Sequence, residues 1–102
     1  MGKFVVTYLG GGMGDTPEEQ EASMNEWMGW FASLGSAVTD VGNPFMGSTA
    51  ITSDGKRTDA ASNLTGYSIV EAKNLEHAVE LTAGCPIFAV GGGVEVRPLM
   101  KM

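Results

Sequence analysis

Few side chains in this sequence could do catalytic or metal chemistry. His77 is its only histidine and Cys85 its only cysteine. A single histidine leaves one possible base for a Ser-His-Asp arrangement, and a single cysteine can form neither an intrachain disulfide nor a thiolate zinc cluster. On a helical wheel His77 falls opposite the apolar side chains of its helix, and no base is visible beside Cys85 to activate its thiol. We therefore expect no metal site and no cofactor.

Two carboxylates remain as candidates for proton transfer. Asp40 precedes Gly42-Asn43-Pro44, where a bulge could re-aim its side chain. Partial burial near the tryptophans would make Asp40 the best general acid or base, and an exposed turn carboxylate is the alternative. Asp59 or a tyrosine could assist in the same way.

Four aromatic residues are the candidates for ligand binding: Tyr8, Trp27, Trp30 and Tyr67. Trp27 belongs to an apolar helical stripe and is expected in the core, whereas Trp30 lies on its flank, where a large aromatic ring can line a cleft edge or an interface. Packing in the core or in a dimer is the alternative for Trp30. The stripe repeats at steps of three and four: Met24, Trp27, Met28, Phe31 and Leu34.

A glycine-rich run, Gly10-Gly11-Gly12-Met13-Gly14, joins a strand to a helix N-terminus, the position that phosphate loops occupy. Its spacing does not match such a loop, because Asp15 stands where the third glycine is needed. Glutamates at 18, 19 and 21 would also repel a phosphate. The run is therefore interpreted as a flexible loop that could gate a pocket.

The elements that position these residues follow from periodicity and capping signals. Thr16 and Pro17 begin a helix that ends at Gly35, and Asn74 begins a second helix that Gly84 stops. Strands are predicted at 3–9, 64–72 and 94–99, with an irregular second strand region of short strands at about 37–41 and 46–52, and loops at 53–63 and 85–93. The order is βαββαβ, which predicts a single α+β, ferredoxin-like domain over 1–102 with strand order 4-1-3-2.

Both faces of the central strands are apolar, although two helices can cover only one face of the sheet. In the first strand Phe4 and Tyr8 point one way while Val5 points the other, and Tyr67 and Ile69 share one side of the third strand. We therefore expect a homodimer packed sheet to sheet, the alternative being a monomer with an open apolar face.

The balance of charges restricts the remaining partners. Twelve acidic and six basic residues give a net charge of −6, which argues against nucleic acid and anionic membranes as partners. No signal peptide or membrane span is apparent, so a cytoplasmic location is expected.

Residues 64–99 resemble the YCII-related, or DGPF-domain, family. The resemblance rests on the runs Gly66–Ala72, Leu75–Leu81, Gly84-Cys85-Pro86 and Gly92–Leu99. It implies a dimeric ferredoxin-like α/β barrel and little about activity, although some relatives are proposed to act on small chlorinated aromatic or lactone-like compounds.

Two departures from the family pattern limit what can be carried over. The Asp-Gly-Pro-Phe signature is replaced by Asp59-Ala60-Ala61-Ser62, so only the aspartate corresponds. Some relatives carry a His–Asp pair, but His77 does not occupy the matching position, so it receives no catalytic role.

These observations lead to three hypotheses. The first is a small homodimer with an aromatic-lined cleft between the first helix and the sheet, which binds a small, mostly apolar molecule and could perform cofactor-free acid/base catalysis. The second is a non-catalytic dimerisation or interaction module. The third is an isomerase or dehalogenase-like enzyme that uses Asp40.

Overall fold

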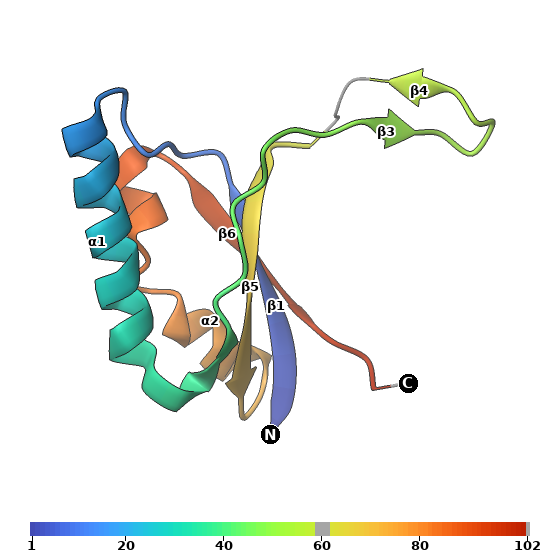
Figure 1. Ribbon diagram of the computed structural model, residues 1–102. Helices are drawn as coiled ribbons and strands as arrows, with labels where there is room; N and C mark the ends of the chain where they lie inside the picture. Colours follow the sequence, from blue (N-terminus) through green and yellow to red (C-terminus); the bar gives the residue numbers. More distant parts are fainter. Residues whose placement is uncertain (59–61, 102) are drawn as a thin grey trace.

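The computed structural model describes residues 1–58 and 62–101 (Figure 1). The helical elements are α1 (Pro17–Leu34), α2 (Leu75–Leu81) and two short 3₁₀ helices, η1 (Gly35–Ala37) and η2 (Pro86–Val90). The strands are β1 (Gly2–Leu9), β2 (Val38–Asp40), β3 (Ala50–Ile51), β4 (Arg57–Thr58), β5 (Leu64–Ala72) and β6 (Gly93–Pro98).

Four strands form one antiparallel sheet in the order β2-β5-β1-β6. This is the predicted 4-1-3-2 order, since β5 and β6 are the third and fourth strands of the sheet. The structure is thus α+β and compatible with a ferredoxin-like fold. Within the described residues the sheet is open and does not close into a barrel.

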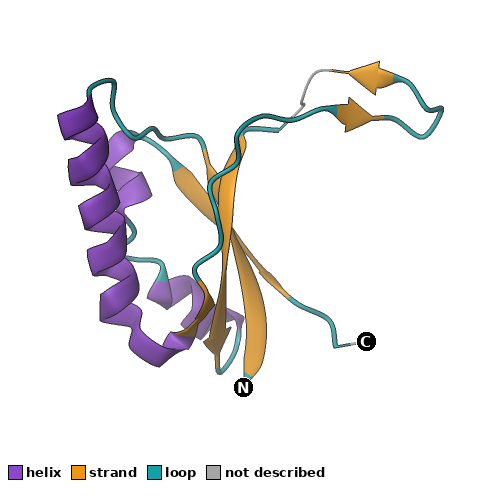
Figure 2. Cartoon of the chain, in the orientation of Figure 1, coloured by secondary structure: helices purple, strands orange, loops and turns teal. Residues whose placement is uncertain are grey.

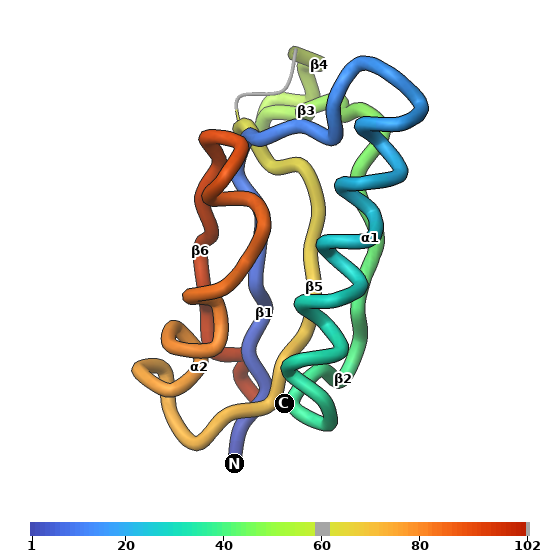
Figure 3. Tube along the Cα trace, turned by 90° about the vertical axis from the view of Figure 1, so that its left-hand side faces the viewer, coloured from blue at the N-terminus to red at the C-terminus, as the bar shows by residue number. Residues whose placement is uncertain are grey.

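The helices α1, α2 and η2 all cover the same face of this sheet, as two perpendicular views show (Figures 1 and 3). Alternate residues of β1 and β5 point into this layer and are buried, among them Val6, Ser68 and Val70. The intervening side chains lie on the opposite, uncovered face, where they are half-buried in the single chain: Val5, Thr7, Leu9, Tyr67, Ile69 and Glu71.

Local capping bonds begin both helices where the sequence predicts. The Thr16 hydroxyl accepts a hydrogen bond from the Glu19 amide at 3.1 Å, and the Asn74 side chain accepts one from the His77 amide at 2.8 Å. Gly35, with φ of 58°, ends α1. His77 also accepts a bond from the Lys73 amide through Nδ1 at 3.0 Å, so its imidazole helps to cap α2.

The apolar side chains of both helices are less buried than their spacing predicts. Trp30 is the one buried residue of α1, whereas Met24 and Met28 of the predicted stripe are 55% and 65% exposed. In α2, Ala78 is buried and Val79 is exposed. Other stripe residues, among them Phe31, Leu34 and Leu81, are partly buried against the core, whereas Met24 and Met28 border the cavity.

The prediction of a sheet strand at 46–52 is wrong. Only Ala50–Ile51 of this stretch is a strand, and it pairs with Arg57–Thr58 rather than with the main sheet. These two strands form a hairpin that stands away from the body of the molecule (Figure 2). The hairpin turn lies in the predicted loop 53–63, where the Thr52 hydroxyl donates to Asp54 and Gly55 has a φ of 83°. In the predicted loop 85–93, residues Pro86–Val90 form the 3₁₀ helix η2.

None of the helices in the described residues is long and apolar enough to cross a membrane.

Candidate functional site

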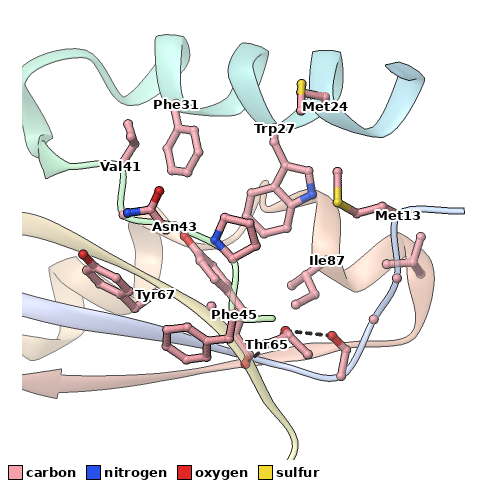
Figure 4. A pocket seen from close by; sticks show the side chains of 18 of the residues that line it. Met13, Met24, Trp27, Phe31, Val41, Asn43, Phe45, Thr65, Tyr67 and Ile87 are labelled. Atoms are coloured by element: carbon pink, nitrogen blue, oxygen red, sulfur yellow. Dashed lines mark hydrogen bonds between the residues drawn. The ribbon is translucent and has the colours of Figure 1, made fainter. Parts of the chain in front are cut away.

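A cavity of about 610 Å³ lies between α1 and one end of the sheet. This volume is within the range of small-molecule sites, roughly 300–1,000 Å³. Four segments enclose it around the ends of β1 and β5: α1, the Gly10–Met13 loop, the connection that follows β2, and η2 (Figure 4). The lining residues are Tyr8, Gly10, Gly11, Gly12, Met13, Met24, Trp27, Met28, Phe31, Val41, Gly42, Asn43, Pro44, Phe45, Thr65, Gly66, Tyr67, Ile87 and Val90.

Trp27 forms the centre of the α1 wall. Its ring meets that of Tyr8 edge to face, with centroids 4.8 Å apart and planes at 81°. Phe31, one helical turn further on, lies 6.0 Å from Trp27. Edge-to-face contacts of this kind hold aromatic rings in fixed orientations, so the wall presents a defined aromatic surface to the cavity.

Trp30 lies behind this wall and does not line the cavity. It is 7% exposed and contacts the rings of Trp27 and Phe31 with centroid distances of 5.8 and 5.0 Å. Trp30 thus takes the core position that was its alternative, whereas Trp27, expected in the core, lines the cavity. Trp30 packs there against Gly84, where an added Cβ would lie 3.6 Å from its ring, at ordinary van der Waals distance.

Tyr8 faces the cavity floor with its hydroxyl group committed to internal hydrogen bonds. It donates to Ser68 Oγ at 2.6 Å, and Ser68 donates to the Val41 carbonyl at 2.6 Å. Burial raises the pKa of the Tyr8 hydroxyl well above its ordinary value. Tyr8 is therefore neutral at physiological pH and unsuited to act as a base.

Tyr67 lies on the other side of the sheet from Tyr8. It pairs with Thr7, whose side chain is on the uncovered face, so its ring shares that face and meets the cavity only at the sheet edge. There it stacks on Phe45, with centroids 6.1 Å apart and planes at 23°. The four aromatic candidates are thus divided, with Tyr8 and Trp27 at the cavity, Trp30 in the core and Tyr67 at the edge.

The connection after β2 passes very close to β5. Gly42 has a φ of 72°, and a Cβ at this position would lie 1.8 Å from the Tyr67 carbonyl oxygen. The Asp40 carboxylate accepts a hydrogen bond from the Gly42 amide at 2.9 Å and supports this turn. Asp40 is exposed and does not line the cavity, so the burial that its catalytic role requires is not observed. Asp59 lies outside the described residues.

The glycine-rich loop forms the cavity wall opposite that connection. Gly10 and Gly11 have φ values of 65° and 77°, and the Gly10 carbonyl accepts a hydrogen bond from the Thr65 hydroxyl at 3.0 Å. A Cβ at Gly11 would lie 3.0 Å from the Ile87 side chain, so glycine allows the loop to pack against η2.

The cavity is apolar and uncharged. None of the described residues that line it carries a charged side chain. The described part of the chain also holds no cluster of three or more histidine, cysteine or acidic residues that could bind a metal ion. Asn43, Tyr67 and Trp27 are lining residues whose side-chain polar groups form no hydrogen bond to another described residue, so they are available to orient a ligand.

Most of this lining is not apparent from the sequence. Phe31 and two methionines belong to the stripe whose spacing indicates a core position, and Phe45 lies next to the segment predicted to continue as a strand. Three remaining apolar residues, Met13, Ile87 and Val90, come from loops that periodicity does not describe. The glycines beside them are the available signal, because they allow these loops to approach the sheet closely.

The fold and the cavity define this chain as a small α+β protein with one helix-covered face and an apolar cavity beneath α1. The model of the YCII-related domain matches residues 11–102, so the chain belongs to the YCII-related family. This match confirms the family resemblance found over residues 64–99 and extends it across most of the chain. A comparison with curated proteins found no match.

The close approach at Gly42 leads to a first prediction. Gly42→Ala should destabilise the protein by about 2 kcal/mol or more, because the methyl group would overlap the Tyr67 carbonyl and the positive φ is strained. The melting temperature should fall by about 10 °C. Gly47→Ala is the control, since nothing lies within 4 Å of its Cβ and its φ is not positive. Equal melting temperatures for the two variants would contradict the close approach of this connection to β5.

Cys85 leads to a prediction for alkaline pH. Burial raises the pKa of its thiol to about 11. The unfolded chain therefore loses the thiol proton at lower pH than the folded chain does. The stability that this group contributes is complete below pH about 9 and is lost as the pH rises to about 11. Urea unfolding of Cys85→Ala at several pH values should show a shallower decline over this range than wild type. Parallel declines would show that the thiol does not titrate as burial predicts.

Proposed function

We propose that this protein binds a small, neutral, largely aromatic molecule in the cavity beneath α1. The observation that carries the proposal is the uncharged aromatic and methionine lining of a cavity of about 610 Å³. Trp27 and Phe31 offer ring edges and faces, and methionine side chains adapt to irregular apolar surfaces. Asn43, Tyr67 and Trp27 supply a few polar groups for hydrogen bonds, which suits a largely apolar ligand with a hydroxyl or carbonyl group.

The lining supports binding better than acid/base catalysis. The Tyr8 proton is donated to Ser68, the Thr65 hydroxyl is donated to the Gly10 carbonyl, and Asp40 lies outside the cavity. A general acid or base must reach the reacting atom within hydrogen-bond distance. We therefore favour a binding function. Asp40 then has a structural role, because it maintains the turn at Gly42.

The proposal is tested with two ligands of the same shape. We expect 2-naphthol to bind and to shift the indole N–H resonance of Trp27, whereas 2-naphthoate should not bind. The carboxylate would lose its hydration in a cavity whose described lining offers no opposite charge. Trp27→Ala should weaken naphthol binding about tenfold, because stacking of one ring contributes roughly 0.5–1.5 kcal/mol beyond its buried area.

The control for this titration is Val79→Ala, because Val79 is exposed on α2 and does not line the cavity. It should bind 2-naphthol as wild type does. Equal binding of naphthol and naphthoate would contradict a neutral-ligand site. Absence of binding by both would favour the interaction module without a ligand.

We also propose that the protein is a homodimer packed sheet to sheet, as an α/β barrel built from two chains. The support is the uncovered face of β1 and β5, where Val5, Leu9, Tyr67 and Ile69 are only half-buried in one chain. The Phe45–Tyr67 stack extends this face to the sheet edge. Burial of such a face removes apolar surface from water and favours association.

Ile69→Asp tests the dimer, because it places a charge in the middle of the proposed interface. Sedimentation should give twice the chain mass of 10.7 kDa for wild type and the single mass for the variant. Tyr67→Glu should act in the same direction. Ala83→Asp adds the same charge at the exposed end of α2 and should stay dimeric. A monomeric wild type at micromolar concentration, or an unaffected Ile69→Asp variant with native circular dichroism, would refute this interface.

A further inference from the structure

The β3–β4 hairpin is an arm without a surface of its own to pack on. It extends from the end of the sheet toward the side opposite the helices (Figures 1 and 3). Met46 is fully exposed at its base and Ile51 is 67% exposed on β3. An isolated two-stranded hairpin is at best marginally stable in water, so this arm needs a partner surface.

A second copy of the chain is the occupant that the geometry favours. The arm projects on the same side as the uncovered sheet face, so a copy packed on that face would lie next to it. In a two-fold dimer each arm meets the other subunit in the same way, so both arms gain a surface to pack on. This inference rests on the proposed sheet-to-sheet dimer.

Charge indicates where on the second copy the arm docks. Lys56 and Arg57 supply the arm with two of the six basic residues of the chain, and neither forms an ion pair with another described residue. The first turns of α1 carry exposed Glu18 and Glu21, at the same end of the molecule as the arm (Figure 1).

The opposite end of the sheet is less favourable for a basic arm, because its charges are mixed: Lys3 lies across from Glu71, and Lys73 follows β5. A two-fold axis parallel to the strands would carry each arm to the acidic end of its partner. An axis across the strands would carry it to the end of mixed charge.

We propose that the β3–β4 arm is an intersubunit clasp, which crosses the first turns of α1 in a second copy of this chain. Lys56 and Arg57 face Glu18 and Glu21 of the partner subunit. Met13 and Met24 line the cavity close to these turns, so the docked arm borders the cavity of the partner. Each site is then built from two subunits.

Complementary charge reversal tests this contact. One variant carries Lys56→Glu with Arg57→Glu, and the other carries Glu18→Lys with Glu21→Lys. Each variant alone sets like charges against each other and should dimerise about tenfold or more weakly than wild type at low salt. An equimolar mixture pairs each arm with an opposite charge in the heterodimer, so it should recover dimerisation close to that of wild type in sedimentation velocity.

Mixing distinguishes a lost clasp from a fault in folding. Weaker capping of α1 by the introduced lysines, for example, is not repaired by a second chain. Lys73→Glu is the control for net charge and should dimerise like wild type. The clasp is overturned if the mixture dimerises as weakly as its components, or if either charge variant dimerises as tightly as wild type.

The same samples distinguish this result from failure of the proposed function. A dimer that depends on Ile69 but shows no recovery on mixing refutes the clasp alone. A monomeric wild type refutes the clasp together with the dimer, and the naphthol titration still decides the ligand site independently.

Discussion

The packing of Trp30 determines the position of α1, and the candidate site depends on that position. Among the described residues of α1 only Trp30 is fully buried, and Trp27, Phe31 and Leu34 pack partly buried against the same core. Together these contacts fix the rotation of the helix about its axis. Trp27 and Phe31 are then directed toward the end of the sheet instead of into its centre. A large aromatic residue buries enough apolar surface to fix one contact point, so the neighbouring rings are left free to form a wall.

The pleat of β1 and β5 directs alternate side chains to the two faces of the sheet, and each face has a different role. Tyr8 points toward the helices and Tyr67 points away, so one strand pair supplies both a cavity floor and an apolar outer face. The hydrogen bonds from Tyr8 to Ser68 and from Ser68 to the Val41 carbonyl connect β1, β5 and the connection after β2. Buried polar groups that are fully paired in this way hold their elements in one arrangement. The cavity wall at Gly42 is therefore supported by the core of the sheet.

The parts of this structure that depend on neighbouring residues were predictable from the sequence. Thr16, Gly35 and Asn74 define helix ends through bonds that span only a few residues. The element order also follows, because hydrophobic periods distinguish strands from helices. The choice between Trp27 and Trp30 for the cavity wall was not predictable, since a helical wheel gives relative angles and does not show which side meets the sheet.

Two other features depend on contacts between distant segments. The β-forming residues around Ile51 indicate a strand but do not identify its partner, and the partner turned out to be β4. The exposure of Asp40 follows from its bond to the Gly42 amide, and that turn exists because the chain must pass close to the Tyr67 carbonyl. Neither contact can be recognised from the amino-acid composition of the segments around it.

The distribution of charge disfavours anions at long range and ions of either sign inside the cavity. The chain has a net charge of −6, so anions are repelled before they reach the surface. At the cavity itself the described lining has no charged side chain, so an ion of either sign would lose hydration without gaining a partner. Glu18 and Glu21 lie on the first turns of α1, whereas Trp27 and Phe31 lie further along it. The same helix would therefore attract a basic partner at its beginning and accept uncharged rings along its length under the proposed function, because the two surfaces use different residues.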